Sequence, residues 1–241
     1  MSSLFKIATI NNISKVGLER FPKNLYKIGT LDNEIKKPVA LLLRSHKLKN
    51  EQVGESISAI ARCGAGTNNI PVDKMSTRGI PVFNTPGANA NSVKELVVCS
   101  LFLSSRNITG AINHVQNLTE SKGFKYAGDL IEKDKKLFSG TEIKGKTLGV
   151  IGLGSIGSQV AMAGASLGMK VIGFDPDEEK CKLAESLGIP ALKLDKGNNP
   201  VDWSLIQTDG IGLDGVLVTA STSSNEPLNL AARCCRKRGR V

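Results

Sequence analysis

Three glycines between an apolar stretch and an alanine-rich stretch form the pattern with the clearest chemical meaning in this chain. Val150 and Ile151 lead into Gly152, Gly154 and Gly157, which are spaced as G-x-G-x-x-G. In a strand–turn–helix unit the first glycine allows the tight turn, the second lets the backbone approach a pyrophosphate, and the third lets the helix pack closely on the strand. The free N–H groups at the start of the helix then face the phosphates. The sequence therefore predicts a dinucleotide-binding site.

An acidic residue after the next apolar stretch distinguishes between two forms of such a cofactor. Residues 170–174 are predicted to form a second strand, and Asp175 follows it, 18 residues after Gly157. A carboxylate in this position can accept hydrogen bonds from ribose hydroxyls but repels a 2′-phosphate. We therefore expect NAD rather than NADP. An ordinary glycine-rich turn is the alternative, and it would explain neither the alanine-rich segment at 159–167 nor the position of Asp175.

Length, composition and cysteine usage are typical of a globular protein. The 241 residues are 40% hydrophobic and 22% charged, which suits one or two domains with a sizeable core. No apolar run approaches the ~18 residues of a membrane-spanning helix, and the segment from Met1 to Lys6 lacks the apolar stretch of a signal peptide. The five cysteines are scattered without metal-ligand spacing, and there are two histidines. We therefore expect a reduced, cytoplasmic protein with no metal site.

A formal net charge of +10 raises the question of an anionic partner. Part of this charge lies near the end of the sequence, in Arg233, Arg236, Lys237, Arg238 and Arg240. These cations could form a nucleic-acid patch, or they could lie on the last turn of a helix, where the helix dipole favours positive charge and Gly239 ends the helix. We prefer the helix end, because no aromatic residues are interleaved with the cations to stack on bases. Nucleic acid is therefore not expected as a partner.

The first 85 residues alternate between apolar and polar segments. Five segments are predicted as strands: Phe5–Ile10, Leu25–Ile28, Val39–Leu43, Ile57–Arg62 and Pro81–Phe83. This alternation predicts an α/β fold with two doubly wound parallel sheets, flavodoxin-like in the N-terminal part and Rossmann-type in the C-terminal part. The expected division is a substrate domain over residues 1–90, a bridging helix and connector arm over 91–140, and the dinucleotide-binding domain over 141–241.

A long helix is expected between the two sheets. The segment from Ser92 to Glu95 has the pattern of a capping box, with Ser92 as the N-cap and Glu95 at the third helical position. Apolar residues recur from Leu96 to Leu118, which predicts a buried helix that bridges the domains. The mixed, polar residues 119–140 are interpreted as an arm or connector.

Three polar loops follow strands of the first predicted sheet. Arg44 and Ser45 follow the third strand, residues 63–68 the fourth, and residues 84–87 the fifth. The carboxyl ends of parallel strands share one edge of the sheet, where ligands bind. Arg44 offers a guanidinium to a carboxylate or phosphate, and Gly64–Gly66 offers unobstructed backbone N–H groups. This convergence favours a small-anion site, while a surface ion pair at Arg44 and a plain turn at the glycines stay open as alternatives.

Residues from Phe5 to about Phe174 resemble the D-isomer-specific 2-hydroxyacid dehydrogenases, and most closely their 3-phosphoglycerate dehydrogenase branch. The resemblance is carried by Leu42–Ser45, Ile60–Ile70, Val82–Leu96, Glu142–Gly149 and the glycine motif. It implies NAD-linked oxidation of a small, phosphate-bearing 2-hydroxy acid on the route to serine, and a homodimer. The substrate contacts that it implies are Arg44, Ser45, Gly64, Ala65 and Gly66. The cofactor contacts are Thr67, Gly152, Gly154, Ser155, Ile156, Gly157, Asp175 and Pro176.

Beyond Asp175 the sequence departs from that family and looks like the nucleotide domain of zinc-type medium-chain alcohol dehydrogenases. Residues 178–188, 212–221 and 229–241 carry this second resemblance. It implies a chimera joined near Asp175, or a truncated chain in which both domains are incomplete. Residues 216–218 are predicted as a strand and Asn225–Arg236 as the following helix. Thr219 at the end of that strand is expected either to face the cofactor or to belong to the scaffold.

The catalytic set of the 2-hydroxyacid family has no counterpart in this sequence. In that family an arginine binds the substrate, and a histidine paired with an acidic residue takes the hydroxyl proton. No histidine lies beyond His114, which is expected on the bridging helix, and His46 is expected in a surface loop. We therefore assign no catalytic residue. Two hypotheses follow: an NAD-dependent 2-hydroxyacid dehydrogenase, or a catalytically incomplete NAD-binding protein that lacks the arginine, the acid and the histidine.

Overall fold

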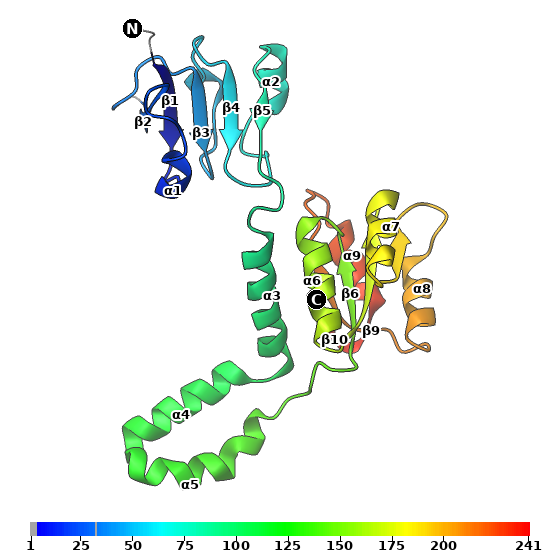
Figure 1. Ribbon diagram of the computed structural model, residues 1–241. Coiled ribbons are helices and arrows are strands. Elements are labelled where there is room, and N and C mark those ends of the chain that lie inside the picture. The colour runs from blue at the N-terminus through cyan, green and yellow to red at the C-terminus, as the bar shows by residue number, and fades with distance from the viewer. Residues whose placement is uncertain (1–3, 32) are drawn as a thin grey trace. The chain divides into compact units, whose positions relative to one another are not determined.

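The computed structural model describes residues 4–31 and 33–241, which form two compact units that divide between Asn89 and Ala90. Each unit contains a five-stranded parallel sheet with helices, as Figure 1 shows. The α/β fold class expected from the sequence is confirmed. None of the described helices is long and apolar enough to cross a membrane. Residues 1–3, which begin the segment inspected for a signal peptide, lie outside the described residues.

The sheet of the first unit has the strand order β2-β1-β3-β4-β5. Its strands are β1 (Phe5–Ile10), β2 (Tyr26–Thr30), β3 (Ala40–Leu43), β4 (Ala59–Arg62) and β5 (Val82–Phe83). All five form where the sequence predicts strands, with ends that differ by no more than two residues. Its helices are short: α1 (Lys15–Leu18), the 3-10 turn η1 (Asn50–Gln52) and α2 (Val72–Thr77). The core is centred on the fully buried Leu41, Leu43, Ile60 and Met75.

The sheet of the second unit has the order β10-β9-β6-β7-β8, with β6 in the centre. Its strands are β6 (Thr147–Ile151), β7 (Lys170–Asp175), β8 (Ala191–Lys193), β9 (Leu213–Val218) and β10 (Cys235–Arg240). The helices that connect them are α6 (Ser155–Ser166), α7 (Glu178–Ser186), α8 (Pro200–Gln207) and α9 (Glu226–Cys234). All five residues of β6 are buried, as expected for a central parallel strand. The chain goes from β6 to β7 on one side and returns to β9 on the other, and ligands bind at such a switch point.

The helix that follows the first unit begins earlier than the sequence suggested and is less buried. α3 spans Ala90–Ser105, so Ser92 lies inside the helix and is not its N-cap. Glu95 accepts a hydrogen bond from the side-chain amide of Asn91 at 2.8 Å and does not complete a capping box at Ser92. Most of its side chains are exposed or half-buried, and Leu101 is the large side chain that is buried. The capping-box and buried-helix predictions are therefore wrong.

The predicted single helix is divided at Asn107. α4 (Ile108–Lys122) begins there, and the Asn107 side chain accepts a hydrogen bond from the N–H of Gly110 at 3.1 Å. An asparagine that caps a new helix competes with continuation of the preceding one, so the prediction of one helix up to Leu118 is wrong. The segment interpreted as a connector contains α5 (Phe124–Asp134) and the 3-10 turn η2 (Lys135–Phe138).

Four of the five basic residues near the end of the sequence lie on an edge strand, and Arg233 lies in the last turn of α9. α9 ends at Cys234, and β10 pairs with β9. The backbone of Cys235 is extended, with φ −72° and ψ 142°. Pairing gives the backbone groups along β9 partners that a longer helix would not supply. The prediction that the helix reaches Arg236 is therefore wrong, and the prediction that the helix end holds the cations is confirmed for Arg233 but wrong for the other four. Cations and an irregular register on an edge strand instead discourage pairing with other chains.

Asp214 links three strands of the second sheet. Its Oδ2 accepts a hydrogen bond from the N–H of Thr147 at 2.8 Å, and its Oδ1 accepts one from Nε of Arg236 at 2.8 Å. The carboxylate thus joins β9 to β6 and to β10. Burial alone would raise the pKa of Asp214, but the Thr147 N–H and the Arg236 guanidinium stabilise the charged form and hold the pKa below its usual value.

We expect Asp214→Asn to destabilise the second unit by about 1–3 kcal/mol at neutral pH, because the change removes the charged acceptor from two donors. The pKa of Asp214 is lower in the folded than in the unfolded state. The stabilisation is therefore complete at neutral pH and is lost as the pH falls below about 4. Urea unfolding at pH 7 and at pH 3.5 measures this, followed by the fluorescence of the single tryptophan, Trp203, which packs edge-on against Phe174.

The control is Asp209→Asn, an exposed position with φ +52°, which asparagine tolerates. This variant should unfold like the parent protein at both pH values. Equal destabilisation by the two variants at pH 7 would contradict the role given to Asp214.

Candidate cofactor site

The turn between β6 and α6 requires glycine at two positions. Gly152 has a φ of +96°, and a Cβ there would lie 2.7 Å from the backbone nitrogen of Ala220. A Cβ on Gly157 would collide with the carbonyl oxygen of Gly152, so α6 approaches the turn too closely for a side chain. Gly154 differs, because apart from its two chain neighbours no described residue has an atom within 4 Å of the place where its Cβ would be. Space is therefore open beside the backbone at the N-terminus of α6, where helix N–H groups can bind an anion.

Two side chains from other strands hold this turn. Asp175, at the end of β7, is 3% exposed, and its Oδ2 accepts a hydrogen bond from the N–H of Leu153 at 2.7 Å. The Thr219 hydroxyl, which follows β9, donates to the carbonyl oxygen of Gly152 at 2.6 Å. Asp175 Oδ1 also accepts from the N–H of Asp177 at 2.9 Å. A carboxylate has about four acceptor positions, so Asp175 keeps capacity for further donors such as ribose hydroxyls.

A cavity of about 560 Å³ lies at the carboxyl ends of the central strands. It brings together eight of the cofactor residues expected from the sequence: Gly152, Gly154, Ser155, Ile156, Gly157, Asp175, Pro176 and Thr219. The sequence analysis did not single out several other lining residues: Lys180, Leu194, Thr222, Ser224 and Glu226. The cluster of hydroxyl residues after β9 could have been found from its position, because it directly follows an apolar strand.

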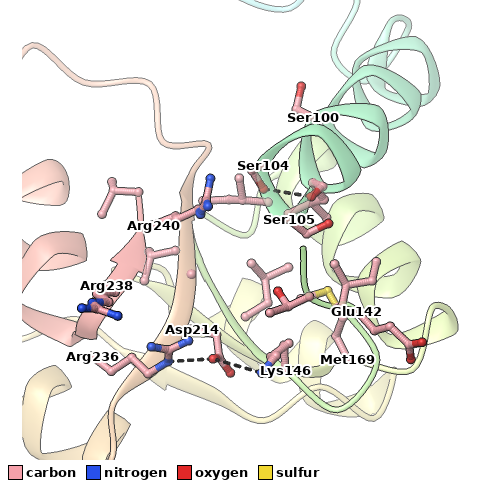
Figure 2. A pocket seen from close by; sticks show the side chains of 18 residues that line it. Ser100, Ser104, Ser105, Glu142, Lys146, Met169, Asp214, Arg236, Arg238 and Arg240 are labelled. Atoms are coloured by element: carbon pink, nitrogen blue, oxygen red, sulfur yellow. Dashed lines mark hydrogen bonds and ion pairs between the residues drawn. The ribbon is translucent and has the colours of Figure 1, made fainter. Parts of the chain in front are cut away.

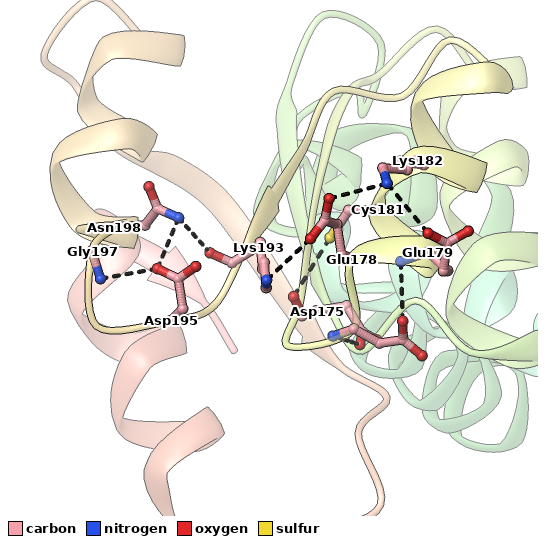
Figure 3. Close-up of polar contacts among 10 residues, drawn as sticks. Asp175, Glu178, Glu179, Cys181, Lys182, Lys193, Asp195, Gly197 and Asn198 are labelled. Carbon is pink, nitrogen blue, oxygen red and sulfur yellow. Dashed lines mark hydrogen bonds and ion pairs between the residues drawn. The ribbon is translucent and has the colours of Figure 1, made fainter.

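Charged side chains of α7 lie next to Asp175. Lys180 Nζ is 3.7 Å from Oδ1 of Asp175 and 3.6 Å from Oδ2 of Asp177, so its charge partly offsets theirs. Glu178 forms ion pairs with Lys182 at 3.0 Å and Lys193 at 3.2 Å (Figure 3). Hydrogen bonds from these two lysines lower the pKa of Glu178. The Glu178 pairs are exposed and contribute little stability, but Lys180 places a cation at the wall of the cavity.

Three cysteines of the second unit are protonated near neutral pH. Burial raises the pKa of Cys181, Cys234 and Cys235. The Cys181 thiol donates to the backbone oxygen of Asp175 at 3.5 Å, beneath the cavity wall. Because the thiolate is the nucleophilic form, these thiols act as packing groups.

The polar loops of the first unit meet at the carboxyl edge of its sheet. The Asn84 side chain donates to the backbone oxygen of Ala65 at 2.6 Å, and Arg62 Nε donates to the backbone oxygen of Arg44 at 3.1 Å. These bonds join the loops after β3, β4 and β5, which carry Arg44, Ser45 and the Gly64–Gly66 segment. Thr67 lies in the loop after β4 and is not among the residues that line the cavity of the second unit.

Arg62 is a residue of this edge that the sequence analysis missed. Its guanidinium lies so close to the glycine loop that a Cβ on Gly64 would collide with it. It ends β4 directly before that loop, just as Arg44 directly follows β3, and this parallel was a usable signal. His46, in the next part of the Arg44 loop, has its Nε2 3.2 Å from Oε1 of Gln52 at the surface.

His114 and Asp134 form the second pairing of a histidine in the described part of the chain. His114 Nε2 lies 3.1 Å from Asp134 Oδ2, and the ring packs against Phe138 at a centroid distance of 5.0 Å. This cluster joins α4, α5 and η2 and does not line the cofactor cavity. Among the described residues, no group of three or more His, Cys, Asp or Glu is arranged to hold a metal ion.

Residues 108–203 match the family described as D-isomer specific 2-hydroxyacid dehydrogenase, NAD binding domain. The chain is 36% identical over 183 residues to the D-3-phosphoglycerate dehydrogenase of Methanocaldococcus jannaschii, over 75% of this chain and 32% of that protein. It is 39% identical over 132 residues to the hydroxypyruvate reductase of Thermotoga maritima, over 55% of this chain and 39% of that protein. The chain spans about a third of the length of these relatives.

Solved structures of similar proteins have the same fold. A 3-phosphoglycerate dehydrogenase of Entamoeba histolytica with bound NAD+ gives a TM-score of 0.59 at 22% identity, over 92% of this chain and 65% of that chain. A glyoxylate reductase of Paecilomyes thermophila gives 0.67 at 17% identity, over 95% and 71%. The family match runs through Asp175 to residue 203, and these comparisons do not show the second, zinc-type resemblance.

Alanine substitutions at Gly154 and Gly157 should affect different properties: the first should weaken NADH binding, and the second should reduce stability. Gly154→Ala adds a methyl group in open space, so it should change stability by no more than about 1 kcal/mol but weaken NADH binding at least about tenfold. Gly157→Ala forces helix and turn apart and should destabilise the unit by about 2 kcal/mol or more. Urea unfolding and NADH fluorescence titration measure the two effects. Parental NADH affinity in Gly154→Ala would contradict a cofactor backbone at this position.

Proposed function

We propose that this chain, a relative of the D-isomer-specific 2-hydroxyacid dehydrogenases, binds NAD in the cavity of its second unit as a 2-hydroxyacid oxidoreductase. The observation that carries the proposal is the open space beside Gly154, at a helix N-terminus, in the same cavity as Asp175. A pyrophosphate needs a close backbone approach and free N–H groups, and an adenosine ribose needs an acidic acceptor. NAD is the cofactor of the domain family that residues 108–203 match. When bound, it supplies the acceptor for a hydride leaving C2 of the substrate.

The residues of the cavity divide into two roles in this proposal. The backbone N–H groups of Gly154, Ser155 and Ile156 bind the pyrophosphate. The Asp175 carboxylate accepts hydrogen bonds from the ribose hydroxyls. Gly152 and Gly157 allow the turn its shape, and Thr219 positions it through the bond to the Gly152 carbonyl. Pro176 lines the same wall as Asp175. A 2′-phosphate would meet the negative charge of Asp175, which supports NAD over NADP.

The substrate side of the proposal rests on the first unit. We assign recognition of a small anionic 2-hydroxy or 2-oxo acid to Arg44, Ser45 and the loop Gly64–Gly66, with Thr67 as a cofactor contact from the same loop. Arg62 adds a second guanidinium at this edge. The Gly64 N–H donates to the Arg62 carbonyl oxygen at 2.9 Å, so the two cations and the backbone N–H groups of Ala65 and Gly66 are the groups that suit a substrate with a phosphate as well as a carboxylate. Relatives named D-3-phosphoglycerate dehydrogenase support 3-phosphoglycerate, and with it a cytoplasmic role in serine synthesis and a homodimer.

The second candidate is an NAD-binding protein without turnover. It is favoured by the positions of the two histidines, because His46 is bonded to Gln52 in a surface loop and His114 to Asp134 between helices. Neither is among the residues that line the cofactor cavity. A zinc-type origin of the residues beyond Asp175 belongs with this candidate, although the family match up to residue 203 does not support a joint near Asp175.

Binding and turnover measured on the same sample distinguish the two candidates. NADH is titrated by its own fluorescence and by quenching of Trp203, and then phosphohydroxypyruvate reduction is assayed. We expect saturable NADH binding. Turnover would support the oxidoreductase, and binding without turnover would support the second candidate. Absence of NADH binding by a folded chain would overturn both.

Asp175→Asn tests the selection of NAD. The amide loses the negative charge and one of the acceptor oxygens, so NADH affinity should fall about tenfold while the preference for NADH over NADPH narrows by a similar factor. Asp177→Asn is the matched control, because Asp177 is the N-cap of α7 and asparagine caps equally well. Both dissociation constants are measured for each variant. An unchanged ratio of the NADPH and NADH dissociation constants in Asp175→Asn would contradict the proposed role of Asp175 in selecting NAD.

A further inference from the structure

A second cavity of the same unit shares no lining residue with the cofactor cavity. It measures about 370 Å³ and lies at the amino ends of β6 and β9, between α3 and β10 (Figure 2). Its floor is apolar and is formed by the buried Leu101 and Leu148, with the partly buried Met169 and Leu217 packed against them. These side chains offer an apolar surface to a small molecule.

One wall of this second cavity is strongly basic. Arg236, Arg238 and Arg240 all line it, while Lys237 does not, which agrees with alternation along a strand. Lys146, which directly precedes β6, adds a further cation. Figure 2 shows Arg240 directed towards the turn of α3 that carries Ser104.

Two of these arginines pair with no carboxylate among the residues that the structure describes. Asp214 is bonded to Arg236 at 2.8 Å and lies 4.0 Å from Lys146, so its charge is already used. Within the described residues no carboxylate pairs with Arg238 or Arg240, and both are exposed at the cavity mouth. Arg238 also has a φ of +64°, a conformation that a non-glycine residue holds at some cost. Arg238 and Arg240 therefore stabilise no ion pair of the fold, and their charges are available to a bound anion.

The serine hydroxyls of the opposite wall do not compete for an anion. Ser100 donates to the Leu96 carbonyl at 2.9 Å, and Ser104 donates to the Leu101 carbonyl at 2.8 Å. Their protons are engaged within α3, whereas the guanidinium groups and Lys146 Nζ are charged donors in the lining. A bare inorganic ion would leave the apolar floor empty, and a metal cation would be repelled by the wall.

We propose that this second cavity binds an organic anion, a carboxylate, sulfonate or phosphate ester on an apolar body, with Arg238 and Arg240 at the head group and the body on the Leu101–Leu148–Leu217 floor. Charge-assisted hydrogen bonds from guanidinium groups hold the head, and burial of the body adds apolar free energy. The site does not depend on the proposed function, because no residue of it lines the cofactor cavity.

The test uses 8-anilinonaphthalene-1-sulfonate, an apolar anion whose fluorescence rises in apolar surroundings, with the full chain and saturating NADH present to occupy the cofactor cavity. We expect one saturable site. The double variant Arg238→Asn and Arg240→Gln should weaken the dye about tenfold or more, because it removes both charged donors. Lys237→Gln removes the same kind of charge from the same strand outside the cavity and should leave affinity within about twofold.

Two competitors separate the head group from the apolar body. p-Toluenesulfonate should displace the dye, and sulfate at equal ionic strength should not. The substituted side chains are exposed, so every variant should unfold at the temperature of the parent protein, and thermal unfolding checks this. The proposal is overturned if the double variant binds the dye like Lys237→Gln, or if sulfate competes as well as p-toluenesulfonate.

Discussion

The turn that leads from β6 into α6 is held by a carboxylate and a hydroxyl that arrive from the two neighbouring strands, and the candidate cofactor site depends on this. Asp175 bonds the Leu153 N–H at 2.7 Å, and Thr219 bonds the Gly152 carbonyl at 2.6 Å. Glycine-rich backbone loses much conformational freedom on folding, so three glycines alone would give a mobile loop. The order β9-β6-β7 supplies the two restraints, and the open space at Gly154 exists because the backbone around it is fixed.

The parts of this fold that the sequence predicted are those that local spacing determines. Five strands of the first unit, the glycine turn and the position of Asp175 each follow from residues close together in the chain. β10 could not be found in the same way, because a basic, glycine-containing segment becomes a strand only through pairing with β9. The break at Asn107 required weighing one local hydrogen bond against continued apolar periodicity, and the local bond wins.

The same distinction explains the site. The glycines and Asp175 carry their chemical meaning in their spacing, but their partners do not. Thr219 lies 67 residues from the Gly152 carbonyl that it bonds, and its scaffold role depends on where β9 lies in the sheet. Lys180 and Arg62 became candidates only when the structure placed one beside Asp175 and the other over the glycine loop. Sequence reasoning thus recovers the residues that must have a given type and misses those that are selected by position.

Asp175 has two roles, and a single substitution at this position changes both. Its buried carboxylate holds the turn through Leu153 and also presents negative charge to the cavity, with Lys180 at 3.7 Å to moderate that charge. In the proposed cofactor site, loop shape and nucleotide selection are therefore coupled through one group. All of these contacts lie inside the second unit, whereas the arginine and glycine loops proposed for the substrate lie in the first. The cavity residues proposed for NAD all belong to the second unit, and Thr67 is the one cofactor contact proposed from the first, so most of the proposed NAD contacts can persist where turnover is lost.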